Sequence, residues 1–349
     1  MEPQNKEKLG LTHPVSFDSS FAYPESISMS TIPPFEFNPA VESSKMSTEK
    51  PKREPDTLEL VTDPSGPPAH PTSKVLVDLA GMSHVGHVRA NNEDHFLGVR
   101  FGRSLETLFT NAEGLQDSSF DLTGYGILVA DGLGGMAAGE VASRTALLRL
   151  VELVVNTPDW IMNLSRDDDV NLVMRRMTKR FRQVDDSLKE QAKRDQSLTG
   201  MGTTLTTAVS LGSDALIAHI GDSRAYLYRD SKLHQLTRDH TLAQAMIDAG
   251  MGSQDDAATR AMRHVLTAAL GSTSDLVNPQ IQRLQILSDD QVLLCTDGLT
   301  EMVKDEIIAS VLHQADSASN ACQTLIDLAL KAGGRDNVTV ALARYSFTD

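Results

Sequence analysis

The sequence predicts an α+β domain built in layers, with antiparallel sheets and helices in separate layers. Strand-like segments rich in Val, Leu and Thr follow one another through short turns, as in antiparallel hairpins. Longer segments with apolar residues at helical spacing lie between these runs of strands. The chain therefore does not show the regular strand–helix alternation of a parallel fold.

The predicted strands are short apolar stretches bounded by turn residues. Breaks at residues 212–214, 221–223 and 230–232 carry Gly, Ser and Asp, which favour turns. Residues 102–123 are predicted to be a polar connection between two strands. The predicted strands, in order, are residues 75–80, 95–101, 125–130, 203–211, 215–220, 224–229, 233–236, 281–286, 291–295 and 338–345.

The predicted helices are segments whose apolar residues recur every three or four positions. Residues 170–193 show this spacing most clearly, with an opposite face rich in Arg and Lys that we interpret as solvated. Residues 241–270 are predicted to be helical with a break at the glycines of 250–253. The remaining predicted helices are residues 141–155, 304–314 and 317–332.

Residues 1–73 differ in composition from the rest and are predicted to be a disordered tail rich in Pro and Ser. Of the 14 prolines, only Pro158 and Pro279 lie beyond residue 71. Such a composition buries too little apolar surface to offset chain entropy. Aromatic patches at residues 17–23 and 35–37 could dock a partner, although a passive tail is the commoner case. The folded domain is predicted to span residues 74–349.

Charge and cysteine usage exclude several classes of function. The net charge is −15 and no dense run of Lys and Arg occurs, which argues against nucleic acid as a partner. Cys295 and Cys322 lie in apolar segments, as reduced thiols of a cytoplasmic protein do, and form no disulfide framework or zinc motif. Neither a signal-peptide pattern nor an apolar run of membrane-spanning length is found. We therefore expect a cytoplasmic protein without a membrane partner.

An aspartate at the end of a buried strand is the first candidate for chemistry. The apolar run at 125–130 leads to Asp131, and the glycines within 132–135 let the backbone turn sharply and approach a ligand. Asp297 likewise follows a predicted strand, at 291–295, and Asp336 lies in the loop before the last strand. A single Asp-Gly is usually an ordinary turn, but several in one acidic domain are less ordinary. Carboxylates without nearby Cys or paired His favour Mg²⁺ or Mn²⁺ over zinc.

A further acidic pair, Glu93 and Asp94, borders the strand that begins at residue 95. Like charges gathered in one pocket repel each other unless a cation neutralises them. If these carboxylates meet in the fold, their cluster implies bound metal.

Taken together and in order, these motifs resemble the metal-dependent serine/threonine protein phosphatases of type 2C, and more closely their bacterial branch. The resemblance covers about residues 74–346. It implies a four-layer α-β-β-α sandwich, in which two packed antiparallel sheets are flanked by helices. The motifs that carry it are residues 89–94, 131–135 with Glu140, 202–204, 221–224, 296–298 and 334–337.

The resemblance also implies a set of metal ligands. Asp131 is expected to bridge two metal ions, and the carbonyl of Gly132 is expected to bind one of them. Asp297 and Asp336 are similar to the carboxylates that complete the second metal site. Glu93 matches the acidic residue that holds the first metal, largely through water.

Other positions are expected to act beside the metals. Arg89 matches the arginine that binds the substrate phosphate, and Asp94 and Asn337 match supporting residues. Leu133 stands where many eukaryotic relatives carry a histidine thought to protonate the leaving group, so the general acid is open. Bacterial relatives often bind a third metal through an aspartate upstream of residue 202, for which Asp195 is the nearest candidate.

The implied activity is hydrolysis of phosphoserine and phosphothreonine by direct attack of a water or hydroxide bound to two metal ions. The implied cofactors are two Mn²⁺ or Mg²⁺ ions, with a third left open. The implied setting is signal transduction, in which a monomeric enzyme opposes a Ser/Thr kinase. Two alternatives remain: a non-catalytic module of the same fold that binds phosphoproteins or kinases, and a hydrolase of small-molecule phosphoesters.

The segment at about 241–265 resembles the family's flap beside the active site, where we expect substrate selectivity. His219, His240 and His264 are interpreted as structural or surface residues. Asp222 and Arg224 are expected to stabilise a tight turn as a pair, without a ligand role.

Overall fold

The computed structural model of this chain describes residues 74–106, 119–134, 137–157, 167–253, 256–272 and 277–348. The predicted tail of residues 1–73, with its two aromatic patches, lies outside the described residues. All described residues belong to one unit, Val61–Asp349.

Two five-stranded sheets form the centre of this unit, and every strand pair in them is antiparallel. The first sheet has the order β1 (Lys74–His84), β12 (Val338–Thr348), β11 (Gln291–Cys295), β8 (Arg224–Arg229) and β9 (Lys232–Gln235). The second has the order β10 (Gln280–Gln285), β7 (Asp214–Ile220), β6 (Leu205–Leu211), β3 (Ser119–Ala130) and β2 (His95–Glu106). A small ladder joins β4 (Gly132–Leu133) to β5 (Gly202–Thr203).

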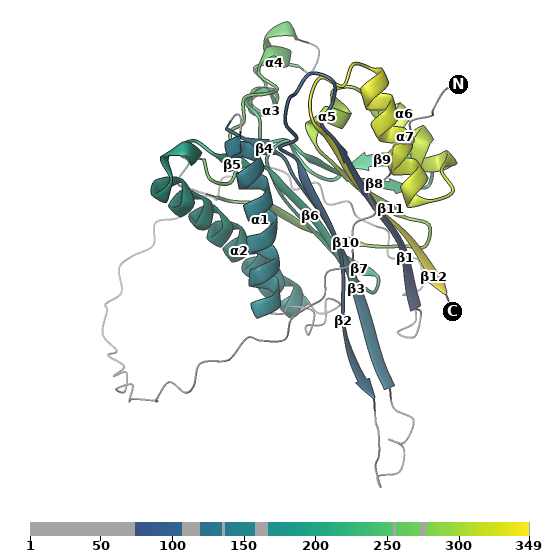
Figure 1. Cartoon of the computed structure of the whole chain (residues 1–349). Helices are drawn as coiled ribbons and strands as arrows, with labels where there is room; N and C mark the ends of the chain where they lie inside the picture. Colours follow the sequence, from purple (N-terminus) through teal and green to yellow (C-terminus); the bar gives the residue numbers. More distant parts are fainter. Residues whose placement is uncertain are drawn as a thin grey trace, which may run out of the picture. The chain divides into compact units, whose positions relative to one another are not determined.

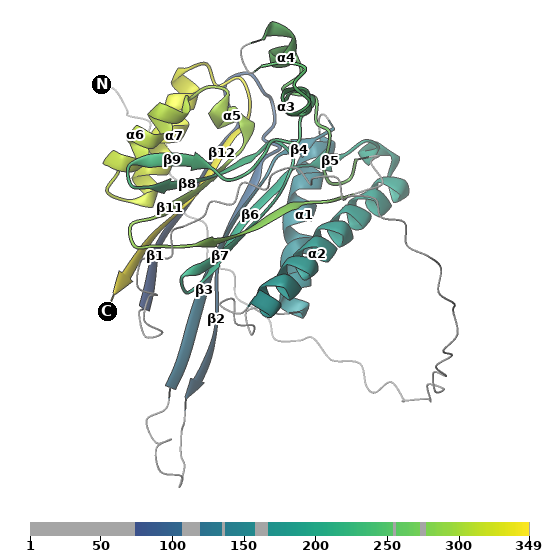
Figure 2. The same ribbon diagram turned by 180° about the vertical axis from the view of Figure 1, so that it is seen from behind.

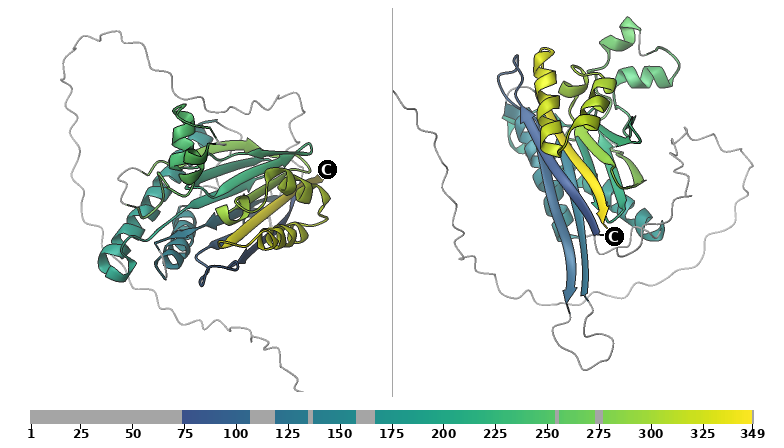
Figure 3. Two further views of the ribbon diagram at one scale, coloured as in Figure 1. Left: turned by 90° about the horizontal axis from the view of Figure 1, so that it is seen from above. Right: turned by 90° about the vertical axis from the view of Figure 1, so that its right-hand side faces the viewer.

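Helices cover the outer face of each sheet (Figure 1; Figure 3). The second sheet is covered by α1 (Ala137–Asn156) and α2 (Asp167–Arg194), which the short helix η1 (Gln196–Leu198) follows. The first sheet is covered by α5 (Asp297–Thr300), α6 (Asp305–Gln314) and α7 (Ala318–Lys331). Two short helices, α3 (Leu242–Asp248) and α4 (Ala257–Ala261), project beyond one end of the sheets (Figure 2). Among the described helices, none is both long enough and apolar enough to span a bilayer.

Three apolar cores separate the four layers, and the alternation of side chains along each strand produces them. On β3, Ile127 and Val129 are buried between the two sheets, whereas Leu128 and Ala130 are buried under α1 and α2. Strand β11 alternates in the same way between the central core and the core beneath α6 and α7. A strand that is apolar on both faces must be covered on both sides. The predicted α-β-β-α sandwich is therefore confirmed.

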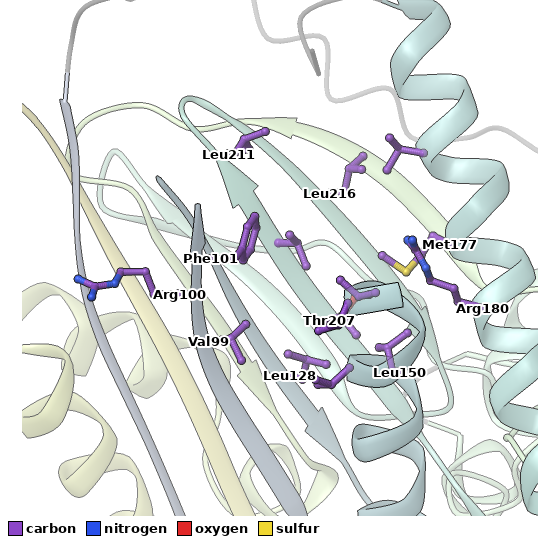
Figure 4. Close-up of a pocket in the computed structure, with 15 residues that line it drawn as sticks. Val99, Arg100, Phe101, Leu128, Leu150, Met177, Arg180, Thr207, Leu211 and Leu216 are labelled. Carbon is purple, nitrogen blue, oxygen red and sulfur yellow. The ribbon is translucent and has the colours of Figure 1, made fainter. Parts of the chain in front are cut away.

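The core between the second sheet and its helices contains an apolar cavity of about 250 Å³ (Figure 4). Leu128 and Leu211 line it from the sheet, and Leu150 and Met177 line it from α1 and α2. The cavity opens to the surface, so truncating an apolar side chain in its wall would enlarge it.

The predicted connection at residues 102–123 was wrong at both of its ends. Strand β2 runs on to Glu106 and β3 begins at Ser119, so that these two residues close a long antiparallel ladder. Pairing of each strand with the other overrides the polar composition, which by itself predicted a loop. Residues 107–118 lie outside the described part of the chain.

The predicted helical segment at 241–270 is helical only in α3 and α4. Thr241 pairs with Leu266 and Thr203 with Leu270 in isolated antiparallel bridges. These long-range backbone contacts hold the second half of the segment in an extended form. Backbone hydrogen bonds join Leu270 to Thr203 of β5 and Val265 to Leu242 at the start of α3.

Candidate functional site

The antiparallel register brings the predicted acidic residues to one end of the sandwich. His95 pairs with Ala130, so the pair of acids before β2 lies beside Asp131 at the end of β3. Cys295 pairs with Val340, so Asp297 after β11 lies beside Asp336 before β12. Four strand ends therefore supply one cluster of carboxylates.

The backbone of Asp131 is fixed by two threonines, Thr203 of β5 and Thr204 directly after it. Its N–H donates to Thr204 Oγ1 at 2.9 Å. Its carbonyl oxygen accepts from Thr203 Oγ1 at 2.8 Å and from the Thr204 N–H at 2.9 Å. Thr204 Oγ1 also lies 2.7 Å from Ser223 Oγ, which ties this turn to the one after β7. The position of Asp131 thus depends on β5 and β7 as well as on its own strand.

Asn337 connects the two halves of the cluster. Its Oδ1 accepts from the Glu93 N–H at 2.8 Å, and its Nδ2 donates to the carbonyls of Val85 and Asn91 at 2.9 and 2.8 Å. Its own N–H donates to Asp336 Oδ1 at 2.8 Å. The side chain is buried, and it holds the loop before β2 against the loop before β12.

Two glycines allow backbone and side chains to approach closely at the site. A Cβ on Gly139, in the first turn of α1, would collide with the carboxylate of Glu93. A Cβ on Gly298 would collide with the carbonyl of Asn337. Any larger residue at either position would push the cluster apart.

Asp94 is the most deeply buried carboxyl of the group, with 5 % exposure. Its Oδ2 accepts from Thr296 Oγ1 at 2.8 Å, while its Oδ1 has no hydrogen-bond partner among the described residues. Burial raises the pKa of Asp94 to about 7, although hydrogen bonds from Thr339 and Thr296 act in the opposite direction. A buried carboxylate oxygen without a donor is costly, and a nearby cation would relieve that cost.

The other carboxyls of the cluster also resist ionisation. Burial raises the pKa of Asp131 well above its usual range, and the charges of Asp94 and Asp297 add to the effect. Burial raises the pKa of Asp297 to about 7, with further contributions from Glu301 and Asp336. These shifts have one cause: several negative groups share a site with little water.

Asp222 belongs to this cluster, and its predicted pairing with Arg224 was wrong. Burial first and the charge of Asp297 next raise the pKa of Asp222 well above its usual range. Arg224 instead makes a bidentate ion pair with Asp239, with Nε–Oδ1 and Nη2–Oδ2 distances of 2.9 and 2.7 Å. Asp222 follows the apolar strand β7 and so shares the strand-end pattern of the other ligand candidates, a signal in the sequence that could have identified it.

Asp195 does not take part in the site. It caps the short helix η1, where its Oδ1 accepts from the Ser197 N–H at 2.9 Å. Its side chain is engaged in local capping on the surface, so Asp222 is the better candidate for an additional cation ligand.

Arg89 lies exposed at the edge of the cluster. Its Nη2 donates to Asp336 Oδ2 at 2.6 Å. A guanidinium has five N–H groups, so donors remain for a second oxygen ligand beside Asp336.

The three histidines divide into two groups. His219 and His240 stack with ring centroids 5.0 Å apart, and His219 is fully buried, so both fit the predicted structural role.

His264 is exposed, and its Nδ1 lies 3.0 Å from Glu301 Oε1. Ligand atoms of His264, Asp297 and Glu301 all lie within 4.8 Å of one another. Glu301 follows Asp297 by four residues on one helical face, a spacing that the sequence already contained.

Leu133, at the position where a proton donor was considered, lies half-buried in β4 and pairs with Gly202. It carries no titratable group, so any proton transfer must come from elsewhere in the site.

The donors present fit hard divalent cations. They are carboxylate oxygens from five segments and the backbone around Gly132, with no thiol among them. Cys295 is fully buried in the core beneath α6 and α7, where burial raises its thiol pKa to about 12. Carboxylate and carbonyl oxygens of this kind favour Mg²⁺ or Mn²⁺ over zinc, and His264, near Asp297 and Glu301, is the one nitrogen donor described at the edge of the cluster.

The four-layer sandwich with a carboxylate cluster at one end fits the class that the sequence motifs resemble, the metal-dependent serine/threonine protein phosphatases. The model of the protein phosphatase 2C family matches residues 112–328. The chain belongs to the protein phosphatase 2C family.

Bacterial relatives support this assignment. The chain is 34% identical over 270 residues to the serine/threonine protein phosphatase PstP of Mycobacterium tuberculosis, covering 77% of this chain and 45% of PstP. It is 30% identical over 276 residues to the protein phosphatase PhpP of Streptococcus pneumoniae, covering 78% of this chain and 99% of PhpP. The chain thus spans less than half of PstP but nearly all of PhpP. The predicted resemblance to the bacterial branch is confirmed.

Solved structures show the same architecture. A crystal structure of the M. tuberculosis phosphatase PstP/Ppp superposes with a TM-score of 0.62 at 32% identity, over 77% of this chain and 99% of that one. The PstP catalytic domain in complex with two manganese ions gives a TM-score of 0.60 at 32% identity, over 78% and 100% of the two chains.

Proposed function

We propose that this protein is a metal-dependent phosphatase that hydrolyses phosphoserine and phosphothreonine in proteins. The observation that carries the proposal is the gathering of Asp131, Asp297 and Asp336 at one end of the sandwich with Arg89 beside them. Family membership and the two manganese ions in the PstP structure support it.

Two Mn²⁺ or Mg²⁺ ions would be held by the carboxylates of Asp131, Asp297 and Asp336, by the Gly132 carbonyl and by Glu93, largely through water. When bound, such ions lower the pKa of water so that it becomes a nucleophile near neutral pH, and they offset the negative charge of a phosphoryl group. Asp222 would extend the ligand set if a third ion binds.

The remaining residues position the substrate and the ligands. Arg89, through N–H groups not used by Asp336, would bind phosphoryl oxygens in the fork geometry that suits a planar guanidinium. Asn337 would hold Glu93 and Asp336 at a fixed separation. Asp94, which accepts a hydrogen bond from Thr296, would support the ligands from the interior. Because Leu133 cannot supply a proton, we infer that solvent at the site protonates the leaving alkoxide.

We further infer a monomeric, cytoplasmic enzyme that opposes a Ser/Thr kinase in signal transduction. Two free, buried cysteines support a reducing compartment. PstP is named as a serine/threonine protein phosphatase and PhpP as a protein phosphatase, which supports phosphoproteins as substrates. We propose that the Pro- and Ser-rich segment at 1–73 is a disordered tail outside the catalytic domain of residues 74–349.

The direct test is hydrolysis of a phosphothreonine peptide by purified full-length protein with and without Mn²⁺ or Mg²⁺. We expect activity only with metal. Asp131→Asn should lower this activity by at least about 100-fold, because loss of a metal ligand costs more than loss of a residue that only orients a ligand. Metal-independent turnover, or normal turnover by Asp131→Asn, contradicts the proposal.

The same assay separates the alternatives. A sugar phosphate at equal concentration should be a poorer substrate than the peptide, whereas the reverse order indicates a small-molecule phosphoesterase. A non-catalytic module would bind the phosphopeptide without releasing phosphate.

A further inference from the structure

A polar cavity of about 440 Å³ opens from the carboxylate cluster toward α3 and α4. Asp222 and Asp297 line it, so it is continuous with the site described above. Its other walls come from β8, β9, α3, α4, α5, the start of α6 and the turn before β12. The helices concerned stand at the same end of the sandwich as α5 (Figures 1 and 2). A substrate bound at the cluster would place its neighbouring residues in this space.

The carboxylates in the walls of this cavity already have partners. Asp239 accepts two short hydrogen bonds from Arg224. Glu301 lies against His264 at 3.0 Å, and Asp305 accepts from the Tyr226 hydroxyl at 3.3 Å. Of these carboxylates, Asp239 is neutralised by the Arg224 guanidinium, whereas Glu301 and Asp305 keep their negative charge beside hydrogen-bond partners that carry no permanent charge.

Two cations in the same cavity have no such compensation. Arg260, in the last turn of α4, and Arg335, in the turn before β12, are both exposed. Within the described residues, neither guanidinium group makes a hydrogen bond or an ion pair, although the backbone of Arg260 takes part in the hydrogen bonds of α4. They approach the cavity from different segments, one on the flap and one beside Asp336. Once cations neutralise Asp222 and Asp297, and with Arg224 paired to Asp239, the remaining lining charges are Arg260, Arg263 and Arg335 against Glu301 and Asp305, an excess of one positive charge.

We propose that Arg260 and Arg335 select phosphoproteins that carry Asp or Glu next to the phosphorylated residue. The inference rests on the proposed phosphatase activity and names the class of substrate for that site. The whole chain has a net charge of −15, so it repels acidic peptides at long range. Selection for them must be local, over the roughly 8 Å within which charges act at physiological salt. Two basic side chains inside the cavity meet that condition.

The test compares three substrates with the full-length, Mn²⁺-loaded protein. Two phosphothreonine peptides share one sequence except that the flanking residues are Glu in one and Gln in the other. The third substrate, p-nitrophenyl phosphate, has no flanking residues. We expect kcat/KM to favour the Glu peptide by about 3- to 10-fold, the range for one or two exposed ion pairs, mainly through KM. The preference should shrink as salt is raised.

The double variant Arg260→Ala/Arg335→Ala should bring the ratio of the two peptides to about one while leaving turnover of p-nitrophenyl phosphate unchanged. The charge-retaining Arg260→Lys/Arg335→Lys should keep most of the preference. Arg175→Ala, an exposed arginine on α2 remote from the cavity, is the matched control and should keep all of it.

Equal kcat/KM for the two peptides in the native protein overturns the inference, and so does a double variant that retains the preference. Failure of the phosphatase proposal looks different, because none of the three substrates would then be hydrolysed.

Discussion

Asp131 depends on neighbours that supply only space or backbone hydrogen bonds. Thr203 and Thr204 fix its backbone, and Gly139 leaves room for the carboxylate of Glu93 on the other side. The geometry of the candidate metal ligands therefore depends on the glycine and the two threonines around them as well as on the carboxylates themselves.

Gly139→Ala isolates this effect. Gly139 lies in α1, where alanine favours the helix by about 0.5–1 kcal/mol, so any loss comes from the close contacts of the new Cβ with the Glu93 carboxylate and the Gly132 backbone. We expect metal affinity to fall about 10- to 100-fold, as when groups that orient ligands are disturbed, without a fall in the thermal midpoint of the metal-free protein. A manganese titration of activity measures the change. Gly98→Ala, which meets nothing within 4 Å, is the control and should titrate like the native protein.

The histidine pair gives a prediction about pH. Burial lowers the pKa of His219 to about 3, from 6.5, and burial also lowers the pKa of His240. Below about pH 6.5, His219 and His240 are therefore protonated in the unfolded chain but stay neutral in the folded chain. Each buried neutral imidazole makes folding less stable by about 1.4 kcal/mol per pH unit as pH falls from 6.5 toward the folded pKa.

Urea unfolding at pH 7.5, 6 and 5 measures that loss. His219→Gln should flatten the dependence, and His234→Gln, on a half-exposed residue of β9, should not. Parallel pH profiles for the native protein and His219→Gln contradict the prediction.

Elements with strong local patterns could be predicted from the sequence, and those decided by long-range pairing could not. The runs that became β3, β7 and β11 are apolar on both faces, and turn residues mark their ends. The ladder from His95 to Glu106 and the bridge between Thr203 and Leu270 depend on partners far along the chain. In the site, Asp131, Asp297 and Asp336 stood out through repeated strand-end motifs. Asp222 also follows a strand, but the sequence predicts a turn there, because Arg224 two residues further on is a possible local partner.

The apolar cavity beneath α1 and α2 predicts how that layer responds to substitution. Leu128 is 4 % exposed and lines the cavity, so Leu128→Ala would enlarge a space that the surrounding helices have not closed. We expect a loss of about 2–5 kcal/mol in the free energy of unfolding. Leu148→Ala makes the same chemical change at a residue of α1 that is 65% exposed and should cost far less. Denaturant unfolding of both variants measures the difference, and equal losses would show that the cavity closes on truncation.

For the molecule as a whole, the carboxylate cluster lowers the stability of the folded state when no cation is bound. The two sheets bury their apolar faces against each other, and at one end this packing forces several carboxyls together. Cations that bind only the folded state reverse the penalty through mass action. Stability and metal binding are therefore coupled through the same residues.

Asp297→Asn should separate the two effects. Removing one buried negative charge relieves repulsion with Asp131 and Asp336, so the thermal midpoint in EDTA should rise. A gain of about 1 kcal/mol corresponds to roughly 2–4 °C for a domain of this size. The same variant loses a donor, so the rise in midpoint on adding millimolar Mn²⁺ should be largely abolished. Asp186→Asn, on an exposed residue of α2, controls for the loss of one charge and should change neither quantity. If Asp297→Asn instead lowers the midpoint in EDTA, its hydrogen bonds stabilise the fold more than its charge destabilises it, and the carboxylate cluster is not a source of strain.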